Sequence, residues 1–147
     1  MPSDRDAIIE TVTKVAWHAD RRNWDAIPGL FADEVLLDYT SLTGGEPATV
    51  SPQQIAGNWE QNLGALDATQ HLLGSYLVDQ VGNTADATAN FIATHIRHQP
   101  LGGGTWTLGG RYHWRLRRGG DTWKIEAMTM TAIWSTGDQS IMTPGQD

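Results

Sequence analysis

From Thr69 onward, apolar and polar residues alternate with a period of two, the pattern of β-strands that bury one face. The alternation predicts four long strands, over residues 70–79, 84–98, 105–118 and 122–134. The breaks between them are short and contain glycine or asparagine. Consecutive strands are therefore expected to be antiparallel neighbours joined by hairpins.

The first half of the chain predicts helices instead. Ser3, with Asp6 three residues later, is typical of a helix N-cap followed by an acidic first turn. Apolar residues then recur at helical spacing: Ile8, Val12, Val15 and Ala19. A second, short helix is expected over residues 24–30, distorted at Pro28.

A short strand and a third helix complete the first half. Residues 35–39 read as a strand in which Val35, Leu37 and Tyr39 share one face, and residues 43–47 read as a loop. Ser51, Pro52 and Gln54 together predict a helix start, with a cap, a first-turn proline and a capping-box glutamine.

Helices followed by a run of antiparallel strands define an α+β fold. We expect one strongly curved sheet wrapped around the N-terminal helices, a half-open cone with a cavity at its wide end. Residues 1–134 would form this single domain. Residues 135–147 would form a tail, either loose or folded over the pocket through Ile141 and Met142.

Composition excludes several function classes. The 147 residues include no cysteine, which excludes disulfides, zinc–thiolate sites and thiol nucleophiles and fits a cytoplasmic protein. The net charge of −7 argues against nucleic acid and anionic membranes as partners. No apolar run reaches membrane-spanning length, and no signal segment is expected. No phosphate-binding glycine motif or metal-binding histidine spacing is present, so no cofactor and no metal are expected.

Asp20 is a carboxylate in an unusual position. It shares helical spacing with Ile9 and Ala16 and therefore lies beside the apolar stripe of the first helix, where acidic residues are uncommon. Either the helix end frays and Asp20 faces water, or Asp20 faces a pocket.

Two of the five histidines are expected to face inward. His95 continues an apolar row of small residues on the second long strand, and is either a core residue bonded to backbone or a pocket base. The row consists of Ala85, Ala87, Ala89, Phe91 and Ala93. His71 opens the first long strand and shares its face with Leu73, Ser75 and Leu77.

These residues fit proton-transfer chemistry. A neutral imidazole can take and return a proton near pH 7, and a carboxylate that accepts its other N–H fixes the tautomer. Asp20 could serve either His71 or His95 in this way. Tyr39 could donate a hydrogen bond to a substrate oxygen, or be a core aromatic residue with a backbone partner.

Six short motifs stand out along the chain: Asp20 with Asn23-Trp24-Asp25, Leu30-Phe31-Ala32-Asp33-Glu34, Asp38-Tyr39, Thr69-Gln70-His71, Gly109-Gly110-Arg111-Tyr112 and Trp123-Lys124-Ile125. Together they resemble the SnoaL-like group of the nuclear transport factor 2-like superfamily, which has a cystatin-like cone fold. The resemblance runs from about Asp4 to Trp134.

Within that superfamily the motifs are most similar to scytalone dehydratases, bile-acid dehydratases and hexachlorocyclohexane dehydrochlorinases. This similarity implies that Asp20, Tyr39, His71 and His95 are catalytic. It also assigns a pocket position to Arg111, although strand parity turns Arg111 outward. A tyrosine found before the aspartate in scytalone dehydratases is Ala19 here.

We therefore expect a cofactor-independent lyase, of the dehydratase type, or an isomerase that acts on a hydrophobic, ring-bearing small molecule. Trp24, Trp59 and Phe91 would supply apolar walls. The alternatives are a polyketide cyclase or epoxide hydrolase, in which Arg111 would act with Asp20, and a non-catalytic binding or dimerisation module. Self-association into a dimer or trimer is expected through the open sheet face, where Trp and Tyr residues of strands 105–118 and 122–134 would be exposed.

Overall fold

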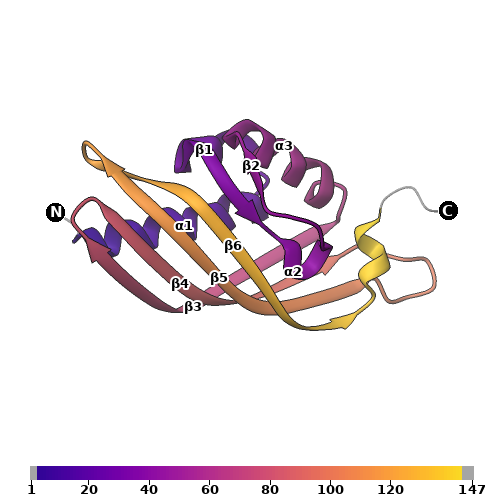
Figure 1. Cartoon of the computed structure of the whole chain (residues 1–147). Helices are drawn as coiled ribbons and strands as arrows, with labels where there is room; N and C mark the ends of the chain where they lie inside the picture. Colours follow the sequence, from indigo (N-terminus) through magenta and orange to yellow (C-terminus); the bar gives the residue numbers. More distant parts are fainter. Residues whose placement is uncertain (1–2, 144–147) are drawn as a thin grey trace.

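The computed structural model describes residues 3–143 as helices packed inside one curved sheet (Figure 1). The helices are α1 (Asp4–Asp20), α2 (Thr40–Thr43) and α3 (Pro52–Leu63), with three single-turn 3₁₀ helices, η1 (Trp24–Ala26), η2 (Pro28–Leu30) and η3 (Gln139–Met142). The strands are β1 (Phe31–Asp38), β2 (Ala48–Val50), β3 (Ala68–Val81), β4 (Thr84–Ile96), β5 (Thr105–Gly119) and β6 (Thr122–Gly137).

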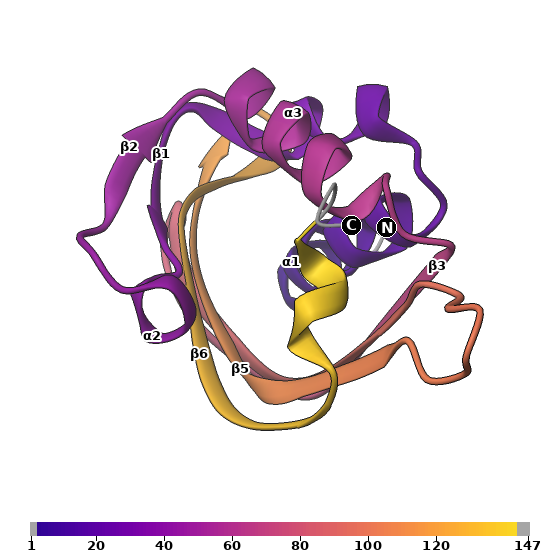
Figure 2. The same cartoon turned by 90° about the vertical axis from the view of Figure 1, so that its right-hand side faces the viewer.

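The sheet has the strand order β2-β1-β6-β5-β4-β3. β1 is parallel to β6, and every other neighbouring pair is antiparallel. Viewed from the end, β5 and β6 curve around α1, and η3 lies in front of α1 at the open end (Figure 2). The predicted α+β cone is confirmed.

Local sequence signals set the helix ends as predicted. The Ser3 hydroxyl accepts a hydrogen bond from the Asp6 backbone N–H at 3.1 Å. Ser51 and Gln54 form a reciprocal capping box, with bonds of 2.8 and 3.2 Å. The helix expected over residues 24–30 is replaced by η1 and η2, because Pro28 has no backbone N–H to continue the first turn.

The four long strands agree with the predicted ranges to within a few residues. The first strand starts earlier than expected, at Phe31, and ends at Asp38, so that Tyr39 lies just beyond it. The sequence analysis missed α2 and β2, which are too short, at four and three residues, to show a periodic pattern. β6 continues past Trp134 to Gly137.

A β-bulge in β3 overturns part of one face prediction. The pairing with β4 shifts between Gly74 and Leu77, and Ser75 adopts a left-handed backbone with φ 56°. An extra residue reverses which side chains face inward beyond it. Leu77 is therefore 72% exposed, whereas Tyr76 and Val78 pack against the core.

The concave face carries the core. The predicted stripe of α1 is buried, and so is the predicted small-residue row of β4. On β5 the buried row includes Tyr112, Trp114 and Leu116, in agreement with strand parity. Because the alanine side chains on β4 are small, they leave space on the concave face of the sheet for α1 and the cavity.

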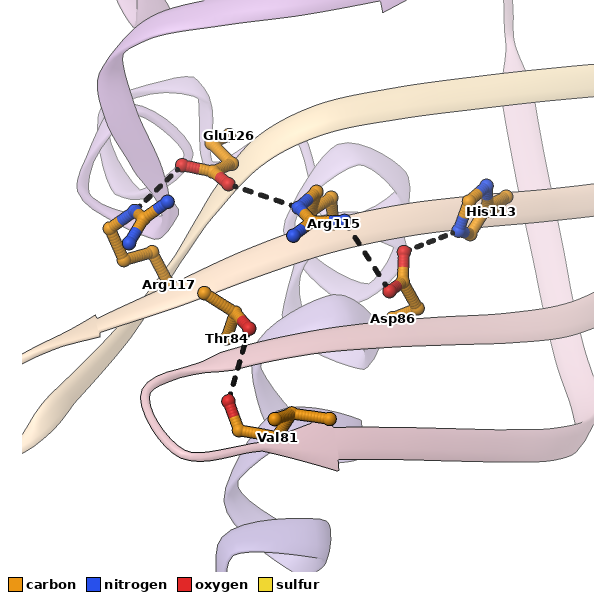
Figure 3. Close-up of polar contacts among 7 residues, drawn as sticks. All are labelled: Val81, Thr84, Asp86, His113, Arg115, Arg117 and Glu126. Carbon is orange, nitrogen blue, oxygen red and sulfur yellow. Dashed lines mark hydrogen bonds and ion pairs between the residues drawn. The ribbon is translucent and has the colours of Figure 1, made fainter.

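The convex face is polar where β4, β5 and β6 carry a network of charged side chains, and it also exposes apolar residues such as Leu72 and Ile92. The carboxylate of Asp86 on β4 contacts His113 Nε2 at 2.9 Å and the Arg115 guanidinium at 3.6 Å (Figure 3). The carboxylate of Glu126 on β6 pairs with Arg115 at 3.4 Å and with Arg117 at 3.2 Å. These alternating charges link β4, β5 and β6 across the surface.

The expectation of exposed aromatic residues on this face is wrong for four of the five Trp and Tyr side chains of β5 and β6. Trp106, Tyr112, Trp114 and Trp123 share the buried parity, and only Trp134 of the five, at 46%, is exposed. Self-association through the convex face stays a prediction.

Because the concave face of the sheet is closely packed, enlarging a side chain there should destabilise the protein more than enlarging one on the convex face. Ala87 is fully buried and does not line the cavity, so Ala87→Leu should overpack the core and lower the free energy of unfolding by about 1–3 kcal/mol. Thr88→Leu, one residue away on the opposite face, should change it by less than about 0.5 kcal/mol. Urea unfolding followed by circular dichroism measures both, and equal effects would contradict the packing described here.

Candidate active site

Asp20 is held in place by the first residues of β3. Its carboxylate accepts three hydrogen bonds: from the Thr69 hydroxyl at 3.0 Å, from the His71 backbone N–H at 2.7 Å, and from His71 Nδ1 at 2.7 Å. The Asp20 side chain is 18% exposed. Of the two alternatives for Asp20, the frayed helix end that faces water is therefore excluded.

Arg22 fixes the end of α1 from the other side. It adopts a left-handed backbone, with φ 61°, directly after the helix. Its guanidinium donates to the backbone carbonyls of Leu63, Gly64 and Leu66, at the C-terminal end of α3, where a positive charge is favourable. The sequence analysis did not single out Arg22.

The hydrogen bond to Asp20 assigns the tautomer of His71. A carboxylate accepts only, so Nδ1 carries a proton, and in the neutral ring Nε2 keeps its lone pair. The His71 side chain is 13% exposed and lies at the wall of the inner cavity. The question of which histidine Asp20 orients is answered by geometry: it is His71.

His95 occupies a separate position beside this pair. Its ring meets the His71 ring edge-on at 5.8 Å between centroids and stacks on Trp106 at 5.0 Å. Its Nδ1 donates to the Trp106 carbonyl at 3.1 Å, which leaves Nε2 as an acceptor. Burial lowers the pKa of His95, and the nearby His71 lowers it further, although the Trp106 carbonyl and the Asp20 charge partly offset this. His95 is therefore held neutral.

An apolar cavity of about 430 Å³ opens beside the two histidines. This volume is in the range of small-molecule sites. Most lining side chains are apolar and come from both the helices and the sheet: Val12, Val15, Leu37, Trp59, Leu63, Phe91, Leu108, Met128 and Met130 are among them. Gln139 and Met142 of the segment after β6 also line it, and Ile141 is buried.

Some of the predicted site residues line the cavity and others do not. Tyr39, His71 and His95 line the cavity, and so do the expected wall residues Trp59 and Phe91.

Two expected site residues lie elsewhere. Trp24 is half-buried beside Gly64 at the end of α3, outside the lining. Arg111 is exposed on the convex face, between Asn90 and Thr131 of the neighbouring strands. The pocket role expected for both is wrong. For Arg111 the reason is strand parity, which turns Tyr112 inward instead.

A second hollow, of about 570 Å³, lies on the other side of the pair, between α1 and β3. Asp20 and His71 both line it, together with Trp17 and Tyr76. His71 thus separates an inner cavity from an outer groove, and its partner carboxylate faces the groove.

Sequence reasoning missed several contributors that parity and periodicity could have revealed. Thr69 is on the same strand face as His71. Tyr112 is on the buried face of β5. Asn58 and Asn62 stand one helical turn apart on α3 and both line the cavity.

Within residues 3–143, His, Asp and Glu side chains do not gather in groups of three that could hold a metal ion. No helix in the same range has both the length and the apolar character needed to span a bilayer.

The fold and the site define a cone-shaped α+β protein with a His–Asp pair at the wall of an apolar cavity. The sequence matches the model of the SnoaL-like domain family over residues 2–129. The chain belongs to this family. A search of curated protein sequences found no significant match.

Solved structures share the fold over nearly the full chain. The Kfla4162 protein of Kribbella flavida is 25% identical, with a TM-score of 0.87 and coverage of 95% of both chains. A scytalone dehydratase candidate from Novosphingobium aromaticivorans is 18% identical, with a TM-score of 0.79 and coverage of 92% of this chain and 88% of its own. A hexachlorocyclohexane dehydrochlorinase is 13% identical, with a TM-score of 0.74 and coverage of 90% and 87%.

The lowered pKa of His95 predicts a pH dependence of stability. In the unfolded chain the pKa of His95 returns towards 6.5, above its folded value, so the unfolded state binds more protons as the pH falls through this region. The free energy of unfolding should therefore decrease from about pH 7 downward, until the pH passes the folded pKa.

Replacing His95 should flatten this dependence. His95→Asn removes the group, and chemical unfolding at intervals between pH 8 and pH 5 should show a smaller slope than in the wild type. His98→Asn, at an exposed histidine nearby in the chain, should retain the wild-type slope. An unchanged slope in His95→Asn would show that burial of His95 does not control stability in this range.

Proposed function

We propose that this protein is a cofactor-independent lyase or isomerase that acts on a hydrophobic, ring-bearing small molecule by proton transfer. The observation that carries the proposal is the 2.7 Å contact between Asp20 and His71 Nδ1 at the wall of an apolar cavity. A base oriented by a carboxylate, next to an apolar cavity, is suited to removing a proton from carbon.

In the proposed elimination, His71 Nε2 takes a proton from a carbon next to a carbonyl group. The electron pair of that C–H bond forms a C=C bond, and the C–O bond to a hydroxyl on the neighbouring carbon breaks. The leaving hydroxide takes the proton from the His71 imidazolium and departs as water, which restores the neutral base. Asp20 stabilises the imidazolium while it exists.

The isomerase variant uses the same first step. The proton then returns from His71 to a different carbon of the ring system, so that a double bond changes position and nothing leaves. In both variants the neutral His95 accepts a hydrogen bond from a substrate hydroxyl, and Tyr39 donates one to the carbonyl oxygen.

The comparisons support the lyase class in general terms. A family match over residues 2–129 and shared folds with a dehydratase candidate and a dehydrochlorinase accord with elimination chemistry. An epoxide hydrolase of the expected kind is less well supported, because Arg111 lies on the convex face, away from Asp20. A non-catalytic carrier would keep the same cavity but would not need the Asp20–His71 contact.

Deuterium exchange tests the proposed base without knowledge of the natural substrate. The protein should catalyse exchange of the acidic C–H protons of bicyclic ketones such as 2-tetralone in D₂O, followed by proton NMR. Asp20→Asn and His71→Ala should each lower the protein-catalysed rate by about 10²–10⁴-fold, because an oriented general base contributes that much.

Matched controls are available on the surface. Asp25→Asn and His98→Ala alter exposed residues of the same types and should leave the rate unchanged. Full exchange activity in correctly folded Asp20→Asn and His71→Ala would refute the assignment of the base. Tight ligand binding without exchange in the wild type would favour the carrier.

A further inference from the structure

Three polar side chains lie together in the cavity, apart from the histidine pair. Tyr39, Tyr112 and Trp114 all line it, amid mainly apolar neighbours. The Tyr112 ring lies 5.2 Å from the Trp114 ring and 4.4 Å from the Phe91 ring, between centroids. The proposed proton transfer uses neither Tyr112 nor Trp114.

The strand register explains why these side chains meet. Met130 of β6 pairs with Tyr112 of β5, and Thr129 pairs with Asp38 at the end of β1. Tyr39, the next residue, therefore lies in the same row as Met130 and Tyr112. The Ser41 hydroxyl anchors this corner, because it donates to the Met130 carbonyl and accepts from the Ala132 N–H, each at 2.9 Å.

Trp114 contributes a hydrogen-bond donor that the protein leaves unused. The side chain is 1% exposed, and its indole N–H has no hydrogen-bond partner among residues 3–143. A buried donor without an acceptor costs free energy, so most such groups have a partner. Part of the Trp114 ring lines the cavity, so a small shift of this ring towards an occupant would give its N–H an acceptor.

The two phenols interact with one another, so one of their two hydroxyl protons is left for a cavity occupant. Burial raises the pKa of Tyr39 well above its ordinary value, and the neighbouring Tyr112 raises it further. Burial likewise raises the pKa of Tyr112, partly offset by its contact with Tyr39. Both hydroxyls therefore keep their protons at neutral and moderately alkaline pH.

We propose that Tyr39, Tyr112 and Trp114 form a subsite that binds an oxygen acceptor of a ring-bearing ligand, such as a ring carbonyl. This inference rests on the proposed function for the ring-bearing class of ligand, and it adds Tyr112 and Trp114 as residues that select oxygenated rings. An oxygen there would accept hydrogen bonds from the Trp114 N–H and from one of the two phenol hydroxyls.

The register also separates this subsite from the base. His71 pairs with Ala93 on β4, and Tyr112 pairs with Ala89, four residues further along the same strand. Four residues of strand span roughly 13 Å. This spacing is between backbone positions, and the Asp20 charge still contributes to the raised pKa of Tyr112, so a single ring system can meet both the subsite and His71.

A matched pair of ligands tests the subsite by binding alone. 1-Tetralone and tetralin are similar bicyclic molecules, of which only the first has a carbonyl group. Calorimetric titration of the wild type gives the ratio of the two affinities. Tyr112→Phe and Trp114→Phe should each lower this ratio by about 3- to 10-fold, mainly through weaker binding of 1-tetralone, as expected for loss of one hydrogen bond.

Two conservative variants outside the cavity serve as controls. Tyr76→Phe removes a hydroxyl that bonds to Thr13 in the outer groove, and Trp17→Phe alters an exposed tryptophan. Both should keep the wild-type ratio. The proposal is overturned if Tyr112→Phe and Trp114→Phe keep it too, if they weaken both ligands equally, or if the wild type binds neither ligand at millimolar concentration.

The outcome is independent of catalysis. If Tyr112→Phe and Trp114→Phe lower the ratio while the wild type shows no deuterium exchange, the subsite stands and the proposed proton transfer fails. If exchange is present and the ratio is insensitive to both variants, the base stands and the subsite fails.

Discussion

The carboxylate of Asp20 joins the helical half of the chain to the β half. One oxygen accepts from Thr69 and from the His71 ring, and the other accepts from the His71 backbone N–H. A charge at the end of a packed helix is tolerated because these donors replace the water it loses. The hydrogen bonds that stabilise the Asp20 charge also hold the His71 imidazole in one tautomer. The same contacts therefore join α1 to β3 and orient the proposed base.

The cavity depends on how the sheet is curved and filled. Alanines on β4 take little volume, and the large aromatic residues of β5 stand opposite them, so that space remains beneath α1. β3 carries the Ser75 bulge. Residues of α2 and η3 also line the cavity. Polar groups enter this space at the histidines, at the Tyr39–Tyr112–Trp114 cluster, and from α3 and η3 through Asn58, Asn62 and Gln139.

Much of the fold was predictable because it follows from short-range rules. Alternation identified β3 to β6, and capping residues identified the starts of α1 and α3. The errors arose where local patterns are weak or are shifted by a single residue. The Ser75 bulge reversed the parity of Leu77, and Pro28 divided an expected helix into two turns. The pocket position assigned to Arg111 by resemblance failed, whereas strand parity had already turned that residue outward.

The sequence by itself determined the long helices and strands, the cone-shaped α+β class and the small set of residues able to carry proton-transfer chemistry, because these depend on periodicity and residue type. Only the tertiary structure decided that Asp20 orients His71 and not His95. Both histidines face inward, and the choice depends on where the end of α1 meets β3, which no spacing along the chain specifies. It likewise revealed the unpaired Trp114 N–H, since a missing partner is visible only when all neighbours are in place.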